Sequence, residues 1–154
     1  MNLSELIWRT KKFDELTLDQ LYAILKLRME VFIVEQNCFY LDLDDVDKVC
    51  LHLYATDSAE NIAAYARAIP QGAVYKSSSF GRVVVHPQWR GTGLGKLLTK
   101  NVMEVIENNF GTTEIKISAQ SHLEKFYASF GFVKCGDEYM DAGILHIPMT
   151  ILRF

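Results

Sequence analysis

The chain has 154 residues, of which 49% are hydrophobic and 23% charged, an ordinary balance for a globular protein with a sizeable core. A formal net charge of −3 disfavours non-specific binding to nucleic acid or to an anionic membrane, so we expect neither partner. The three cysteines lie far apart, and no stretch resembles a signal peptide or a membrane span. We therefore expect one domain over residues 1–154, in the reducing cytoplasm, without disulfides or a metal site.

The first third of the chain predicts a short strand and a long helix. Residues 5–10 have the composition of a strand. Thr17 and Gln20 match the Thr-x-x-Gln capping box that begins many helices, and apolar side chains then recur at helical spacing up to about residue 34. The β-branched side chains within residues 31–36 favour a departure from regular helix. The predicted buried face consists of Leu18, Leu21, Tyr22, Leu25, Met29 and Phe32.

The middle of the chain predicts three strands and a second helix. Residues 49–56 and 62–69 are typical of a β-hairpin with a polar turn, and residues 79–86 of a strand that Pro87 ends. An amphipathic helix begins at Leu94. Its predicted buried face consists of Leu94, Leu97, Leu98, Val102, Val105 and Ile106.

The last third predicts a third helix between strands. Residues 114–118 suit a buried strand. Ser121 and Glu124 match a second capping box, and Gly131 stands where a left-handed C-terminal cap belongs. The apolar face of this helix consists of Leu123, Phe126, Tyr127 and Phe130. Two final strands, 132–140 and 144–151, complete the order β-α-β-β-β-α-β-α-β-β, which is typical of an α+β fold around a mixed sheet.

Three glycines at alternate positions, Gly91, Gly93 and Gly95, stand between a predicted strand and a predicted helix. Because glycine lacks a Cβ atom, backbone N–H groups there can approach a ligand closely. The free N–H groups and the positive dipole end of the helix attract anions. A tight turn without a ligand is the alternative. The spacing fits neither a P-loop nor a Gly-x-Gly-x-x-Gly dinucleotide fingerprint.

The sequence Arg-x-x-Gly-x-Gly formed by Arg90, Gly93 and Gly95 resembles the coenzyme A (CoA) pyrophosphate loop of the GNAT superfamily of N-acetyltransferases. Residues 123–132 resemble the Phe-Tyr-x-x-x-Gly-Phe helix of the same superfamily, and residues 17–152 are similar to its ElaA-like branch. The resemblance implies one GNAT-like domain. Its fold would be a mixed, mostly antiparallel sheet flanked by helices, with splayed central strands.

The resemblance also implies an activity. A primary amine of a small molecule or peptide would attack acetyl-CoA directly, without a covalent enzyme intermediate and without a metal. Many relatives dimerise, so a homodimer stays open, as do the acyl chain length and the identity of the amine. Two rival functions remain at this point. One is an acyl-CoA-binding sensor without turnover, and the other is a nucleotide-binding protein, which the glycine spacing disfavours.

The cofactor-binding residues follow from the resemblance. Backbone N–H groups of residues 91–96 would hold the pyrophosphate, with the cations Arg90 and Lys96 nearby. Main-chain groups of residues 83–85 would hold the pantetheine arm, and the Val83 N–H would donate to the thioester carbonyl. The alternative is that these valines are only a buried strand. The predicted set is Val83, Val84, Val85, Arg90, Gly91, Thr92, Gly93, Leu94, Gly95 and Lys96.

Tyr127 aligns with the tyrosine that protonates the leaving thiolate in many relatives, although its helical face also suits a core aromatic. The general base is less determined by the sequence. We predict Glu35, a carboxylate in apolar surroundings, or His52 on a strand, while His146 and a water chain stay open.

Four aspartates lie within residues 42–47, a spacing that lacks the glycine and glutamate of a calcium-binding loop. The segment is either a solvated loop or an acidic rim that favours a cationic amine.

Overall fold

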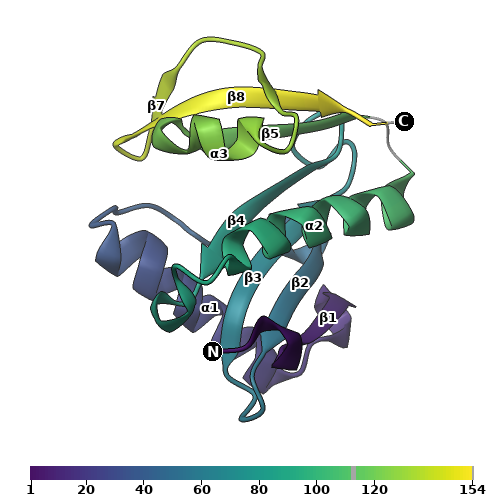
Figure 1. The fold of residues 1–154 in the computed structure, drawn as a ribbon. Coiled ribbons are helices and arrows are strands. Elements are labelled where there is room, and N and C mark those ends of the chain that lie inside the picture. Colours follow the sequence, from purple (N-terminus) through teal and green to yellow (C-terminus); the bar gives the residue numbers. More distant parts are fainter. Residues whose placement is uncertain (112–113, 154) are drawn as a thin grey trace.

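The computed structural model describes residues 1–111 and 114–153. Within them, two four-stranded sheets and three α-helices form the frame (Figure 1). The first sheet, in the order β1-β2-β3-β4, consists of Ile7–Lys12, Leu51–Thr56, Ile62–Ile69 and Ser79–Val85. The second consists of β5 (Glu114–Gln120), β8 (Ile144–Leu152) and β6 (Val133–Lys134) in that order, with β7 (Tyr139–Asp141) also paired to β8. The helices α1, α2 and α3 are Leu18–Arg28, Leu94–Phe110 and Glu124–Ala128.

All paired strands are antiparallel, and the two sheets meet between the parallel neighbours β4 and β5. An isolated parallel bridge joins Ser78 to Ile115, where the Lys116 N–H donates to the Ser78 carbonyl at 2.9 Å. Beyond this bridge, the described residues of the two strands form no further ladder. The expected mixed, mostly antiparallel sheet with splayed central strands is confirmed.

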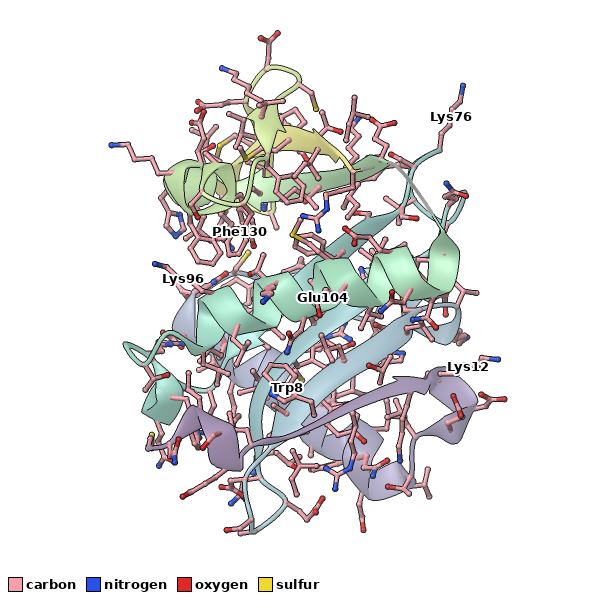
Figure 2. All side chains as sticks on the ribbon, turned by 45° about the vertical axis from the view of Figure 1, so that its right-hand side comes forward. Trp8, Lys12, Lys76, Lys96, Glu104 and Phe130 are labelled. Atoms are coloured by element: carbon pink, nitrogen blue, oxygen red, sulfur yellow. The ribbon has the colours of Figure 1, made fainter. Side chains whose placement is uncertain are left out.

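Helices cover both faces of the first sheet (Figure 1). α2 packs on β3 and β4, and α1 packs on the opposite face of the same strands. Leu94, Leu98, Val102 and Ile106 are buried as predicted, because they recur at helical spacing on the side of α2 that faces the sheet. Trp8 on β1 packs against the edge of this core, and Glu104 lies on the outer face of α2 (Figure 2). No helix in the described ranges is long and apolar enough to cross a membrane.

α1 begins at the predicted capping box. The Thr17 hydroxyl accepts a hydrogen bond from the Gln20 N–H, and the Gln20 side chain accepts one from the Thr17 N–H. Regular helix ends at Arg28, and the chain continues as a π-helix over Met29–Glu35. This transition confirms the expected departure from regular helix.

Of the predicted buried face of the first helix, Phe32 is buried, but the part that falls on α1 is wrong. Leu18 is 84% exposed, whereas Ile24, Leu27 and Arg28 are buried. The side of the helix that faces the sheet therefore carries the charged residue Arg28. A prediction based on apolar spacing would have placed this residue outside the core. Arg28 can occupy that place because aspartates from a later loop neutralise it, an arrangement that hydrophobic periodicity does not report.

Two expectations for the last third are also corrected. The predicted Ser121–Glu124 capping box does not form, because Ser121–Leu123 adopt a 3₁₀ turn and Leu123 becomes the N-cap of α3. The strand expected over residues 132–140 is divided into β6 and β7. Pro148 of β8 has no N–H with which to continue the hydrogen-bonded ladder between β8 and this segment. Gly136 passes close to the Pro148 ring, where a larger residue would clash. Gly131 has the predicted left-handed backbone, with φ +101°.

Candidate active site

A cleft of about 750 Å³ opens where β4 and β5 diverge. We divide it by the helices that flank it. The α2 half is lined by Val83, Val85, Gly95, Phe126 and Tyr127, which pack on the core shared with α2. The α1 half is lined by Tyr40, Asp44, Arg82, Tyr139, Asp141 and His146. A ligand that crosses between the splayed strands would therefore contact both halves.

The β4 wall of the cleft presents unused backbone donors. The His86 N–H donates to the Ala63 carbonyl at 2.8 Å, and the register pairs Val84 with Tyr65. Since hydrogen-bonding directions alternate along an antiparallel strand, the Val83 and Val85 N–H groups face away from β3, toward the cleft.

A bulge in β4 shapes this wall. The register between β3 and β4 shifts after Tyr65, and Arg82 adopts a left-handed backbone with φ +50°. Left-handed backbone is uncommon for a residue with a side chain. The bulge bends the strand immediately before Val83, at the point where the two halves of the cleft meet.

The glycine loop ends at the N-terminus of α2, beside the cleft. Gly91 and Gly93 have φ +76° and +88°, and a Cβ atom on either would meet nothing within 4 Å. Among the described residues, the Gly93 and Gly95 N–H groups have no acceptor in the chain. Lys96 lies in the first turn of the helix (Figure 2). The loop thus combines open space with N–H groups that have no acceptor, a combination suited to an anion.

Two predicted site residues, Arg90 and Glu35, are brought together from positions 55 residues apart. The Arg90 guanidinium donates to both Glu35 carboxylate oxygens, at 2.5 and 2.8 Å. These bonds hold the pKa of Glu35 below its ordinary value. The pair ties the π-helix to the start of the glycine loop, and it leaves Glu35 a weaker base than a free carboxylate.

Tyr127 lines the cleft from α3 and is 6% exposed. Its ring packs against Phe80, Phe126 and Phe132, so it belongs to the aromatic core as well. Its hydroxyl makes no hydrogen bond to the described residues. Because it is not one of the buried polar atoms that lack a partner, the hydroxyl oxygen is accessible from the cleft. Burial raises the pKa of Tyr127 to about 12, so the hydroxyl stays protonated at neutral pH.

His52 lies on β2, is buried, and is not among the residues that line the cleft. Its Nε2 lies 2.8 Å from the Asp47 carbonyl, which can only accept, so Nε2 carries the proton. Its Nδ1 lies 2.7 Å from the Tyr65 hydroxyl. Burial lowers the pKa of His52, which favours the neutral ring. Both ring nitrogens are therefore occupied by structural hydrogen bonds.

The acidic segment of residues 42–47 is neither a solvated loop nor a free acidic rim. Asp42 and Asp47 bind the fully buried Arg28, at 2.9 and 2.7 Å. Asp44 binds Arg67 at 2.7 Å and Arg82 at 3.5 Å. Burial alone would raise the pKa of Asp44, but the arginines overcome it and lower that pKa to about 2. The network fastens the loop after the π-helix to β3 and β4.

Sequence reasoning missed the arginine partners and most of the α1 half. The closely spaced aspartates of residues 42–47 are the one signal in the sequence that could have indicated ion pairs. Tyr75, Tyr139 and Asp141 carry no such signal, because they come from loops and a short strand that only the tertiary fold brings to the cleft. Within residues 1–111 and 114–153, no group of three or more His, Cys, Asp or Glu could hold a metal ion.

Comparisons with known proteins agree with this geometry. A family model described as an acetyltransferase (GNAT) domain matches residues 28–153. Protein ElaA of Escherichia coli is 36% identical over 145 residues, which cover 93% of this chain and 94% of that protein. Its crystal structure matches with a TM-score of 0.87 and 34% identity, over 95% of this chain and 99% of that one. A crystal structure of an acyl-CoA N-acyltransferase from Pseudomonas aeruginosa matches with a TM-score of 0.88 and 36% identity, over 94% and 99% of the two chains. The chain therefore belongs to the GNAT acetyltransferase family and, within it, to the ElaA-like branch.

Proposed function

We propose that this protein transfers an acetyl group from acetyl-CoA to a primary amine of a small molecule or peptide, by direct attack. The observation that carries the proposal is the cleft between β4 and β5, which has free backbone donors along one wall and the glycine loop beside it. The open space over Gly91 and Gly93 fits a pyrophosphate, because added Cβ atoms would meet no protein atom there.

When bound, acetyl-CoA supplies an activated thioester carbonyl. The chain's own groups then have separate tasks. The N–H groups at the start of α2 bind the phosphates, and the Val85 N–H holds the pantetheine arm in register. The Val83 N–H donates to the carbonyl oxygen as negative charge develops there, an interaction worth about 3 kcal/mol of barrier when it is preorganised.

Tyr127 provides the proton for the departing sulfur. Its pKa of about 12 makes it a weaker acid than a solvated tyrosine. The thiolate leaves into the same cleft, however, and burial raises the proton affinity of both groups. The two raised affinities offset each other, so transfer from the hydroxyl to the sulfur is supported by the position of Tyr127.

A panel of amines tests the proposal. Thiol release from acetyl-CoA is followed with a thiol-reactive chromophore, with polyamines, amino sugars and peptides as acceptors and a reaction without amine as the control. Amine-dependent thiol release supports the transferase. Tight acetyl-CoA binding by calorimetry, without release for any amine, would instead favour a sensor. Absence of acetyl-CoA binding would overturn both functions.

A further inference from the structure

The α1 half of the cleft carries one unpaired carboxylate. Asp44 is neutralised by Arg67 and Arg82, and Arg90 at the other end is neutralised by Glu35. Among the described charged side chains that line the cleft, only Asp141 forms no ion pair and no hydrogen bond. The carboxylate available to a ligand is therefore Asp141, and not one of the aspartates of residues 42–47 as the sequence suggested.

His146 lies beside Asp141, on the neighbouring strand of the same hairpin. The register pairs His146 with Tyr139 and Ile144 with Asp141, so Tyr139, Asp141 and His146 share one face of the sheet. The Nδ1 atom of His146 lies 2.7 Å from the Ile144 carbonyl and therefore carries a proton. In the neutral ring, Nε2 is then the basic nitrogen, and it has no partner among the described residues.

Hydroxyl and aromatic groups hold this imidazole in place. The His146 ring stacks on the Tyr139 ring, with centroids 6.0 Å apart and planes inclined by 26°. The Tyr139 hydroxyl bonds to Ser118 of β5 and to Tyr75. Other titratable groups that line the cleft near this hairpin are Tyr139 and Asp141 from β7, Tyr75 from the loop before β4, and His122 from the turn after β5. The unpaired carboxylate of Asp141 supplies the charge that attracts an ammonium.

Resting on the proposed function, we infer that His146 is the general base and that Asp141 makes the α1 half select cationic amines without a carboxylate. One ammonium proton passes to His146 Nε2, which later returns it to solvent. The amine nitrogen then forms the C–N bond while the C–S bond breaks. A second proton leaves the nitrogen to solvent, the third remains on the amide, and Tyr127 protonates the thiolate and is reprotonated from solvent.

The positions of the acid and the base agree with this assignment. Ile147 and Met149 of β8 are buried in the core that contains Tyr127. His146 precedes them on the opposite face of the strand, because side chains alternate. Both side chains nevertheless line the cleft, so each can contact a ligand bound there.

The base is tested with His146→Asn, whose amide can still donate to the Ile144 carbonyl. At neutral pH we expect kcat/KM for the amine to fall by about 10²- to 10⁴-fold. The deficit should shrink as the pH approaches the amine pKa of about 10.4, where free amine no longer needs a base. His86→Asn, outside the cleft, is the matched control. Acetyl-CoA affinity by calorimetry should be unchanged in both variants.

Selectivity is tested with three four-carbon acceptors: 1,4-diaminobutane, butylamine and 4-aminobutyrate. We expect KM to rise in that order. Asp141→Asn should raise KM for 1,4-diaminobutane about three- to tenfold with little change in kcat. The affinity of the Asp141→Asn variant for 1,4-diaminobutane, measured by calorimetry without acetyl-CoA, should fall by a similar factor. Asp137→Asn, which removes the same charge from the nearby loop, should change neither.

The outcomes separate the two proposals. If no amine releases thiol, the proposed function fails and this inference fails with it. If thiol is released but His146→Asn retains full kcat/KM, or the three acceptors have equal KM values, only the inference is overturned.

Discussion

Burial changes the acid chemistry of Tyr127 while leaving its proton in place. Three aromatic neighbours exclude water from the ring and raise its pKa to about 12. A tyrosine with this pKa is protonated throughout the range in which most folded proteins are assayed. The hydroxyl is therefore available as a donor at any such pH, and its contribution to the rate should not titrate.

Tyr127→Phe removes only the hydroxyl, so we expect the fold and the acetyl-CoA affinity to persist. If protonation of the thiolate limits turnover, kcat should fall by roughly 10²- to 10⁴-fold. The loss should be the same from about pH 6.5 to pH 9, because the wild-type hydroxyl is protonated throughout. Steady-state kcat against pH measures this, with the exposed Tyr22→Phe as control. A mutant with near-full kcat would make Tyr127 a core aromatic only.

Glu35 shows the opposite change, since Arg90 stabilises its charged form. The base role predicted from the sequence would require Glu35 to accept a proton, but Arg90 disfavours the protonated carboxyl. We therefore expect Glu35→Gln to change kcat by less than about threefold, whereas loss of a base costs about 10²-fold or more. Steady-state measurement of kcat distinguishes these outcomes, and Glu30→Gln on the same π-helix is the control. A loss of 10²-fold would restore Glu35 as the base.

At the scale of elements, the first turn of α2 depends on left-handed glycines. Gly93 is the N-cap, with φ +88° and open space where a Cβ would be. A side chain there meets two costs, namely backbone strain and obstruction of the anion site. The two costs can be separated, because Gly72 has φ +86° with equally open surroundings outside the glycine loop.

We expect Gly93→Val to abolish acetyl-CoA binding and Gly72→Val to leave it unchanged, although both variants strain the backbone alike. Calorimetric titration gives the affinity, and circular dichroism shows whether each variant is folded. Unchanged affinity in a folded Gly93→Val protein would refute the assignment of the pyrophosphate to this loop.

The loop after the π-helix is fastened by charge pairs to the elements beneath it. Asp47 accepts from Arg28 at 2.7 Å and from Arg67 at 3.1 Å, and both arginines are almost wholly buried. Removing one partner of such a pair leaves a buried charge uncompensated. Asp47→Asn should therefore cost about 3 kcal/mol of unfolding free energy, close to the low end for buried pairs because Asp42 and Asp44 remain.

Urea unfolding measures this loss. Asp45→Asn, which breaks only the exposed pair with Lys48, should leave the midpoint unchanged. Equal midpoints for Asp47→Asn and the wild type would show that the network does not contribute to stability.

At the scale of the molecule, three groups held by ion pairs or by burial make stability depend on pH in one direction. The pKa values of Asp44, Asp47 and His52 are all lower in the folded protein than their ordinary values. The unfolded chain therefore binds more protons as the pH falls, and stability decreases by linkage. The full contribution is present above about pH 6.5, the ordinary pKa of histidine.

We expect Tm to fall first between about pH 6.5 and 5, as unfolded His52 gains a proton that the folded ring resists. A steeper fall should follow below about pH 4, where unfolded aspartates are protonated, and continue toward pH 2. Thermal melts across this range measure both steps, and Asp47→Asn should reduce the second step. A Tm that stays constant or rises on acidification would contradict the assignment.

Much of the fold follows from local patterns in the sequence. The capping box at Thr17 and the apolar face of α2 were predictable, because each depends on residues within a few positions of one another. The hairpin of β2 and β3 and the glycine loop before α2 follow for the same reason. The buried side of α1 was not predictable in this way, because Arg28 is placed there by aspartates 14 and 19 residues away.

The candidate site divides along the same line. The sequence alone determined the α2 half, namely the glycine loop, the β4 valines and Tyr127, because their residues stand in short contiguous motifs. Only the tertiary structure decided the α1 half. It paired Arg90 with Glu35, occupied both nitrogens of His52 and neutralised Asp44. Among the described residues it left the Asp141 carboxylate unpaired, and of the His146 ring nitrogens only Nδ1 has a partner. The physical reason is that the charge available to a ligand depends on which opposite charges the fold brings within a few ångströms, and those partners are distant in sequence.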